Sequence, residues 1–249
     1  MDRNNITNKK LSSVSVFFPC YNDAGTIGKM IENAMETLPS ITNDFEVIVV
    51  NDASTDNSRQ ILAEFESRYP SHLFRVIDHA ANRDYGGALQ SGFANCKKEF
   101  IFYTDGDGQY DVKEIVKLLS LMSDEIGIVT GHKSKRTDSW YRAIIGILYR
   151  KIVKTIFQLS VIDVDCDFRL IRRSVFQNVQ LETTSGAICI ELLKKIQDAG
   201  FHLAQVTVSH FPRIYGKSQC FRPARIWKMV KSIPILWWKL VFLRWWRKN

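Results

Sequence analysis

Short apolar runs alternate with amphipathic stretches over the first half of the chain, and this alternation limits the fold more than any other feature. The apolar runs are rich in β-branched and aromatic residues and end at Pro, Asn, Asp or Gly, which predicts strands. The predicted strands are 14–20, 45–50, 73–78, 99–104 and 126–131. The stretches with helical spacing are 25–38, 54–69, 86–96 and 111–122. This order predicts an α/β fold with a mostly parallel central sheet and helices on both faces.

The second half of the chain is less regular. A helix is expected over 140–160, a second over 187–199 and a strand over 201–210. On a helical wheel, four polar residues of the first helix lie within roughly 100° of one another: Arg150, Lys151, Lys154 and Gln158. In the first half, Ser54 and Asp111 are the residues expected to cap helices.

Size and cysteine usage describe an ordinary globular chain. Its 249 residues, 45% hydrophobic and 24% charged, can bury a full core. The five cysteines are Cys20, Cys96, Cys166, Cys189 and Cys220. Because they are scattered and never spaced C-x-x-C, we expect neither a disulfide framework nor a structural zinc site, which fits a reducing cytoplasm. The polar first 13 residues predict no signal peptide.

The net charge of +8 is concentrated at one end of the chain. Residues 213–249 contain ten Lys or Arg and no Asp or Glu, which leaves 24 basic and 26 acidic residues for the first 212. Five of the six tryptophans lie in the same segment. The division predicts a nearly neutral catalytic domain at 13–212 and a basic, Trp-rich tail at 213–249.

The strongest chemical signal is the motif YTDGDGQYD at 103–111, which follows a predicted strand. Asp105 and Asp107 stand one residue apart, and the intervening glycines let the backbone turn tightly. With the amide oxygen of Gln109, they form a set of hard oxygen ligands suited to Mg²⁺ or Mn²⁺ carrying a diphosphate. The alternative is an acidic turn that only caps the following helix, because Asp-Gly pairs are common in turns.

Two other polar loops are expected at the same edge of the sheet, since the carboxyl ends of parallel strands lie together. Asp52 ends a strand, where its carboxylate can accept hydrogen bonds from a base or a ribose hydroxyl. Asp56 more simply caps the next helix. After the first strand, Tyr21 offers a stacking face and Asp23 an acceptor. Together with the acidic motif, these loops predict a nucleotide bound through its diphosphate.

The motifs PCYND, NDASTD, NRDYGGAL and DGDGQYD occur in this order along the first half of the chain. They are followed by DCDFRLIRR, by Glu191 within ICIELL, and by HFPRIYGKSQ. The series resembles the family 2 glycosyltransferases with the GT-A fold, within them the polyprenyl-phosphate (dolichol-phosphate mannose synthase-like) branch. The resemblance covers about 13–220, and the order of the motifs is more specific than any one of them.

The resemblance implies roles for particular residues. Nucleotide-sugar binding would involve Pro19, Tyr21, Asn22, Asp23, Asp52, Asp105 and Gly106. The metal would be held by Asp105, Asp107 and Gln109. The acceptor phosphate would be bound by Arg169, Arg213, Lys217 and Ser218, for which surface salt bridging is the alternative. The catalytic residues would be Asp107, Asp167, Arg169 and Arg213.

Two positions depart from the family pattern. The first motif often ends in Glu, whereas this chain has Asp23, one methylene shorter. Asp84 stands before Tyr85 where a glycine is expected. Both positions are expected near the nucleotide pocket, so the base and the sugar stay open.

The tail is expected at a membrane surface. Its longest uncharged run, 232–238, is far shorter than the about 20 apolar residues of a membrane span. A basic, Trp-rich segment is instead typical of an interfacial helix among anionic headgroups, and Pro234 is expected to break or kink it. The helix at 140–160 is a second candidate. The alternative for both is packing against the domain or against a second copy in a homo-oligomer.

The sequence thus predicts transfer of a hexose from a GDP- or UDP-linked sugar to a polyprenyl phosphate, with inversion implied by the resemblance. A phosphate monoester carries about −1.5 to −2 charges at neutral pH, so positioning and charge neutralisation are expected to matter more than a general base. The predicted location is cytoplasmic, at the inner face of the plasma membrane. A glycan or other hydroxyl acceptor is the alternative. Nucleic-acid binding, suggested by the basic tail, is disfavoured because the acidic motifs would repel a phosphate backbone.

Overall fold

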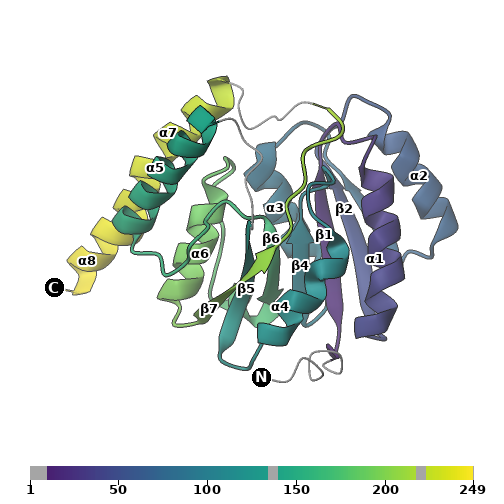
Figure 1. Cartoon of the computed structure of the whole chain (residues 1–249), viewed down its shortest axis with the longest axis horizontal. Coiled ribbons are helices and arrows are strands. Elements are labelled where there is room, and N and C mark those ends of the chain that lie inside the picture. Colours follow the sequence, from purple (N-terminus) through teal and green to yellow (C-terminus); the bar gives the residue numbers. More distant parts are fainter. Residues whose placement is uncertain (1–9, 134–139, 217–222, 249) are drawn as a thin grey trace.

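The computed structural model describes residues 10–133, 140–216 and 223–248. Its centre is a seven-stranded sheet in the order β3-β2-β1-β4-β6-β5-β7 (Figure 1). The strands are β1 (Val14–Cys20), β2 (Phe45–Asn51), β3 (Phe74–Asp78), β4 (Phe100–Thr104), β5 (Ile126–Lys133), β6 (Phe168–Arg172) and β7 (His202–Val208). Among them, β6 pairs antiparallel with β4 and β5, and the other pairs are parallel. The predicted α/β class and mostly parallel sheet are confirmed.

Helices cover both faces of the sheet, as predicted (Figure 1). In the first half they are α1 (Ile27–Ile41), α2 (Ser58–Arg68), α3 (Asp84–Asn95), the short 3-10 turn η2 (Val112–Glu114) and α4 (Ile115–Leu121). In the second half they are α5 (Trp140–Phe157), the 3-10 turn η3 (Arg173–Gln177), α6 (Ile188–Asp198) and α7 (Pro223–Trp237). After α7, the described residues form a π-helical turn η4 (Trp238–Phe242) and the helix α8 (Leu243–Lys248).

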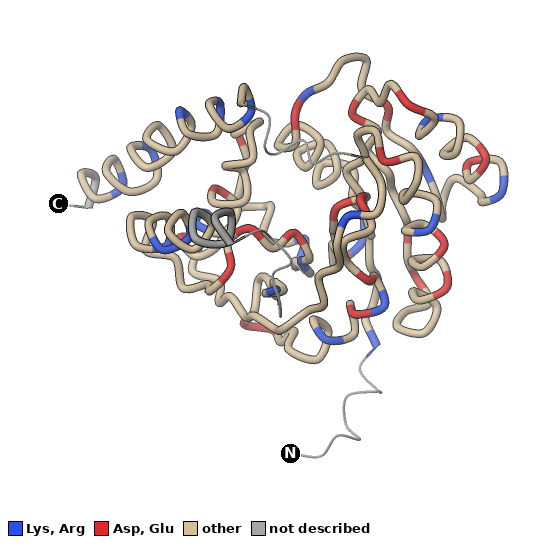
Figure 2. The backbone as a smooth tube through the Cα atoms, turned by 45° about the horizontal axis from the view of Figure 1, so that its top comes forward, with Lys and Arg blue, Asp and Glu red and all other residues tan. Residues whose placement is uncertain are grey.

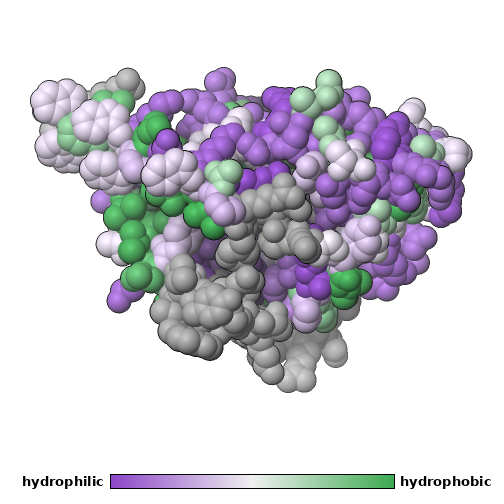
Figure 3. Space-filling view, turned by 90° about the horizontal axis from the view of Figure 1, so that it is seen from above, coloured by the Kyte–Doolittle hydropathy of each residue, from purple (hydrophilic) through white to green (hydrophobic). Residues whose placement is uncertain are grey.

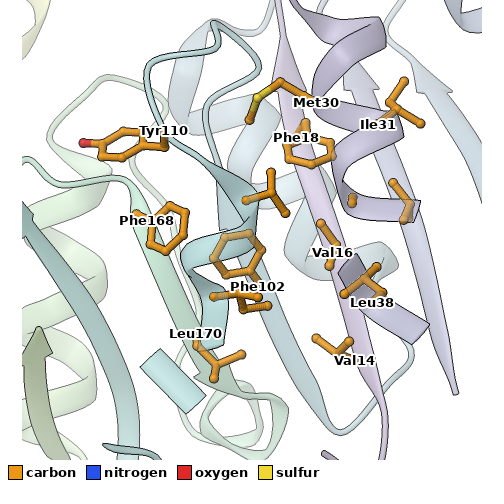
Figure 4. Packing of buried hydrophobic residues seen from close by; sticks show 14 of the residues in the cluster. Val14, Val16, Phe18, Met30, Ile31, Leu38, Phe102, Tyr110, Phe168 and Leu170 are labelled. Carbon is orange, nitrogen blue, oxygen red and sulfur yellow. The ribbon is translucent and has the colours of Figure 1, made fainter. Parts of the chain in front are cut away.

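The core on one face of the sheet follows from side-chain alternation along the strands. Val16 and Phe18 of β1 point to this face, whereas Phe17 between them packs on the other. Figure 4 shows Val16 and Phe18 beside Phe102 of β4, with Met30 of α1 packed over them. All seven residues of β1 are buried, as expected of a central strand covered on both sides. The buried sheet therefore gives a rigid base to the loops that leave it.

Three local predictions can be compared with the structure. Asp111 caps the turn η2, as predicted, because its carboxylate accepts from the backbone N–H of Lys113 at 3.0 Å. The prediction for Ser54 was wrong: α2 begins at Ser58, and the Ser54 hydroxyl accepts from the loop after β1 instead. Pro234 does not end the tail helix, since α7 continues to Trp237 and a π-helical turn follows.

The tail helices lie beside α5 at one end of the molecule (Figure 1). Leu236 is buried against the domain, and the Trp237 indole N–H donates to the Ile156 carbonyl oxygen at 3.0 Å. Packing against the domain, offered above as the alternative, therefore accounts for one side of the tail. No helix within the described ranges is long and apolar enough to cross a membrane.

Candidate functional site

Polar loops from three neighbouring strands meet at one edge of the sheet. β1 lies between β2 and β4, so the loop after β1 adjoins both Asp52, after β2, and Asp105, after β4. Gly106 lies so close to β1 that an added Cβ would be 3.0 Å from the Pro19 carbonyl oxygen. The backbone N–H of Gly106 also donates to that oxygen at 3.3 Å. The close approach explains why a glycine separates the two acidic residues.

Asp105 is partly buried and lies in a negative environment. The hydroxyl of Tyr85 donates to its carboxylate at 2.8 Å. Withdrawal from water and the charges of Asp167 and Asp107 raise the pKa of Asp105 well above its usual range, although the hydrogen bond from Tyr85 opposes this. A carboxyl group in this position favours either a proton or a nearby cation.

Asp107 and Asp23 share one cation. The Arg213 guanidinium contacts Asp107 Oδ2 at 2.7 Å through Nη2 and Asp23 Oδ1 at 3.2 Å through Nη1. Both aspartates are almost fully buried. Burial raises the pKa of Asp23 to about 6, although the charge of Arg213 acts in the opposite direction. Arg213 Nε is buried and has no hydrogen-bond partner among the described residues, so one donor of the guanidinium is unsatisfied in this arrangement.

Arg213 is presented by a segment that we call the strap, residues 209–216, which follows β7 and crosses the loop after β4. The backbone N–H of Phe211 donates to the Gln109 carbonyl oxygen at 2.8 Å, and Gln109 Nε2 donates to the Phe211 carbonyl oxygen at 3.0 Å. Farther along, Tyr215 covers Gly25 so closely that a Cβ there would be 2.3 Å from its ring. Gln109, a predicted metal ligand, is thus hydrogen-bonded to the backbone of the strap. Its role in metal binding stays a prediction.

Asp52 and Asn22, two of the predicted nucleotide residues, lie where the loops after β1 and β2 meet. Asp52 is 3% exposed, and its carboxylate contacts His79 Nδ1 at 2.6 Å and accepts from the Arg83 backbone N–H at 2.8 Å. The Asn22 side chain accepts from the backbone N–H of Thr55 at 2.7 Å. Asn22 therefore joins the loops after β1 and β2. The Tyr21 ring faces a guanidinium from α7, described below.

Asp56 has the structural role that was favoured for it. Its carboxylate accepts from the backbone N–H of Ser58, the first residue of α2, at 3.0 Å. The other oxygen accepts from the backbone N–H of Ala24 at 3.1 Å. Asp56, one position before the N-cap Asn57, therefore joins the loop after β1 to the first residue of α2.

Arg169 was predicted to bind the acceptor phosphate, and the structure gives it a different position. Its side chain is completely buried beneath the site. It donates to the carbonyl oxygens of Cys166 at 3.0 Å and Val164 at 2.6 Å and to the Tyr103 hydroxyl at 2.8 Å. Arg169 Nε, Nη1 and Nη2 all donate to protein oxygens, so the residue supports the loop that carries Asp167. Because its side chain is completely buried, it is not placed to bind the acceptor phosphate.

Asp167 is held from three sides. Tyr103 donates to its Oδ1 at 3.3 Å, the Cys189 thiol lies 3.1 Å from the same oxygen, and Arg169 Nη2 is 3.8 Å away. Tyr103 and Cys189 were not singled out from the sequence as site residues, and neither were Tyr85 and His79. Tyr103 could have been found, because it lies two residues before Asp105, near the end of β4. The predicted residues Lys217 and Ser218 lie outside the described residues.

The four aspartates of the site outnumber its two arginines. Asp23, Asp105, Asp107 and Asp167 face Arg169 and Arg213. Among the described residues, no group of three or more His, Cys, Asp or Glu is arranged as a ready metal site. The site can therefore supply two carboxylates, at Asp105 and Asp107, and an anionic ligand with water would complete the coordination of a divalent ion. The excess negative charge and the hard oxygen donors fit Mg²⁺ or Mn²⁺.

Comparisons with known proteins identify the family of the chain. The sequence pattern of glycosyl transferase family 2 matches residues 15–180, more than half of the chain. A curated relative, the undecaprenyl-phosphate 4-deoxy-4-formamido-L-arabinose transferase of Proteus mirabilis, is 26% identical over 215 residues. That match covers 86% of this chain, and the chain spans only 64% of the length of that relative.

Solved structures show the same fold. Glucosyl-3-phosphoglycerate synthase of Mycobacterium tuberculosis, in complex with Mn²⁺, UDP and glucosyl-3-phosphoglycerate, superposes with a TM-score of 0.68 at 16% identity, covering 92% of this chain and 79% of that one. A mannosyltransferase of Pyrobaculum calidifontis, in complex with GDP-Man and Mn²⁺, gives a TM-score of 0.63 at 18% identity, covering 89% of this chain and 64% of the other. The chain therefore belongs to glycosyl transferase family 2 and has the GT-A fold.

Proposed function

We propose that this glycosyltransferase moves a hexose from a GDP- or UDP-linked sugar to a polyprenyl phosphate. The observation that carries the proposal is the pair Asp105 and Asp107 at the end of β4, with Asp52 on one side and Arg213 on the other. The pair suits a metal-bound diphosphate, Asp52 suits a nucleoside, and Arg213 suits a second anion. The name of the Proteus mirabilis relative supports a polyprenyl phosphate acceptor.

The metal is assigned by charge and ligand type. Asp105 and Asp107 would hold Mg²⁺ or Mn²⁺, and solved structures of the same fold contain Mn²⁺ with UDP or with GDP-Man. When bound, the ion neutralises the charge that develops on the departing diphosphate. The chain itself orients these carboxylates: Tyr85 donates to Asp105, and the backbone N–H of Gln109 donates to Asp107 Oδ1 at 3.0 Å.

The acceptor determines the rest of the mechanism. A phosphate monoester oxygen is already nucleophilic at neutral pH, so the enzyme has to bring two anions together against their repulsion. Arg213 is suited to this task because its planar guanidinium can bind phosphate oxygens in pairs once it leaves Asp107 and Asp23. Lys217 and Ser218, a few residues farther along, are proposed to assist. Asp167 is proposed to orient the acceptor.

Exposed apolar side chains support a location at an anionic membrane surface. On α5 they are Ile147, Leu148 and Ile152, and on the tail helices they include Trp227, Val230, Ile235, Trp238, Trp245 and Trp246. Figure 3 shows hydrophobic side chains gathered at the end of the molecule formed by α5 and the tail. Basic residues recur along the same tail helices without acidic ones (Figure 2). This combination is typical of interfacial helices among anionic lipids.

The function is tested by incubating the purified protein with a panel of UDP- and GDP-sugars, with or without a short-chain polyprenyl phosphate. We expect a glycosylated lipid phosphate to form with one donor, only when lipid and Mn²⁺ or Mg²⁺ are both present. Chelation with EDTA should abolish the product, and added Mn²⁺ should restore it, because the diphosphate is held through the metal. Transfer only to a glycan, or hydrolysis of the donor without transfer, would contradict the proposal.

The membrane surface has its own test. Replacing Trp245 and Trp246 together by serine should weaken binding to anionic phospholipid vesicles by about tenfold, because both indoles are more than half exposed. Vesicle sedimentation measures the change. Leu121→Ser on α4, an exposed apolar residue away from the tail, serves as the control and should bind like the unmodified protein. Equal binding of both variants would rule out the tail as the docking surface.

A further inference from the structure

The first turns of α7 contact Tyr21, one of the predicted nucleotide residues, and Asp84. The Arg225 guanidinium carbon lies 5.4 Å from the centre of the Tyr21 ring. Arg225 Nε is also 3.8 Å from Asp84 Oδ1, and Lys228 forms a closer ion pair with Asp84 Oδ2. Two cations of the tail therefore converge on one carboxylate, at the start of α3 and more than 130 residues away in the sequence.

Asp84 is unusual in its backbone as well as in its partners. Its φ of 61° lies in the left-handed region that favours glycine, where other residues are strained by roughly 1 kcal/mol or more. Its neighbours are both used by the site: the Arg83 N–H donates to Asp52, and the Tyr85 hydroxyl donates to Asp105. An aspartate at this position gives the edge of the pocket a charge that a glycine would lack.

We infer that Asp84 is a positioning residue that fixes the start of α7 beside the pocket, so that Arg225 and Tyr21 together form a wall at its nucleoside end. The inference rests on the proposed function and adds the residues that recognise the nucleoside. A guanidinium is planar and stacks on aromatic rings, bases included. Arg225 is partly exposed, so without Asp84 it would gain many competing orientations in water.

The rest of α7 is held independently of Asp84. Leu236 is buried, and Met229, Ile233 and Trp237 pack against the core beneath the helix. Loss of the ion pairs should therefore loosen the first turns of α7 and leave the remainder in place. Glycine at position 84 adopts the required φ without strain, so Asp84→Gly removes the carboxylate and preserves the backbone.

The test compares Asp84→Gly, Asp84→Asn and Arg225→Ala by calorimetric titration with UDP, GDP and inorganic pyrophosphate, each with Mn²⁺. For the nucleoside diphosphate that the unmodified protein binds more tightly, we expect affinity to fall by about tenfold in all three variants. Pyrophosphate affinity should change by no more than about twofold, since the residues act at the nucleoside end. The double variant Asp84→Gly/Arg225→Ala should be no weaker than Arg225→Ala alone, because the two residues act as one unit.

Hydrogen exchange gives a second readout: amides of residues 224–230 should exchange faster in Asp84→Gly and more slowly when nucleotide is added to the unmodified protein. Lys231→Ala is the matched control, because Lys231 lies on the same helix over the Trp227 ring. It should leave both measurements unchanged. Unchanged nucleotide affinity in Asp84→Gly, an equal loss for pyrophosphate, or tighter binding in Arg225→Ala would each overturn the inference. If the unmodified protein bound neither nucleotide, both the proposed function and this inference would fail.

Discussion

Replacing Asp105 by asparagine should lower the rate of sugar transfer by about a hundredfold or more, because it removes charge where the diphosphate must be held. Asparagine has nearly the same shape and still accepts the hydrogen bond from Tyr85, so the loop after β4 should keep its conformation. The loss should therefore be in turnover and metal affinity rather than in stability. Steady-state kinetics, Mn²⁺ titration and thermal unfolding measure the three quantities.

The matched control for this variant is Asp111→Asn. Asp111 belongs to the same motif, but its carboxylate caps the turn η2 through the N–H of Lys113. Asparagine is an equally good cap, so this variant should retain transfer within about twofold. If both variants lost activity equally, the motif would act through the structure of the loop. If both stayed active, Asp105 would not belong to the metal site.

The strands and helices of the first half could be predicted because their signals are local. Each apolar run carries its own periodicity, and the glycines and aspartates at its ends mark where the strand stops. The strand β6 could not be separated from the loop before it. It pairs with Phe100–Thr104 of β4, more than 60 residues earlier, and depends on that distant partner for its hydrogen bonds. The insertion of β6 as an antiparallel strand between β4 and β5 leaves no pattern in its own sequence that would predict it.

The candidate site shows the same division between local and distant information. Asp52 and Asp105 could be located because ligands bind beyond the carboxyl ends of parallel strands. The position of Arg169 could not, since a buried arginine and a phosphate-binding arginine look alike in a sequence. Its burial depends on Tyr103 and on the carbonyl oxygens that accept from it. His79, the partner of Asp52, likewise becomes visible only once β3 lies beside β2.

The tail packs against the domain on one side, and its role at a membrane surface stays a prediction. Composition predicts an interfacial segment, and Trp238, Trp245 and Trp246 are more than half exposed, as that prediction requires. Composition could not show which side of the helix meets the domain, because apolar residues occur all around it. Leu236 and Trp237 are used for packing, and their neighbour Trp238 is half exposed. Two of the basic residues of the tail, Arg225 and Lys228, contact Asp84 at the start of α3.

Arg213→Ala should have two opposite effects. Transfer should fall by about a hundredfold, because the acceptor phosphate loses the cation that offsets its repulsion from the donor. Binding of Mn²⁺ alone should become several-fold tighter, on the order of fivefold, because Arg213 neutralises Asp107 and Asp23 in this structure and competes with an added ion. The titration belongs at mildly alkaline pH, since the pKa of Asp23 is already about 6 and would rise without Arg213.

Arg59→Ala serves as the control, because Arg59 forms surface ion pairs with Glu66 and Asp78 away from the acidic pair. It should change neither transfer nor Mn²⁺ affinity. A loss of transfer with unchanged Mn²⁺ affinity would mean that Arg213 already points away from Asp107 in solution. Weaker Mn²⁺ binding would mean that Arg213 holds the two carboxylates in place for the ion. Tighter Mn²⁺ binding with lost transfer is the result expected if one guanidinium leaves the carboxylates when the metal arrives and becomes available to the acceptor phosphate.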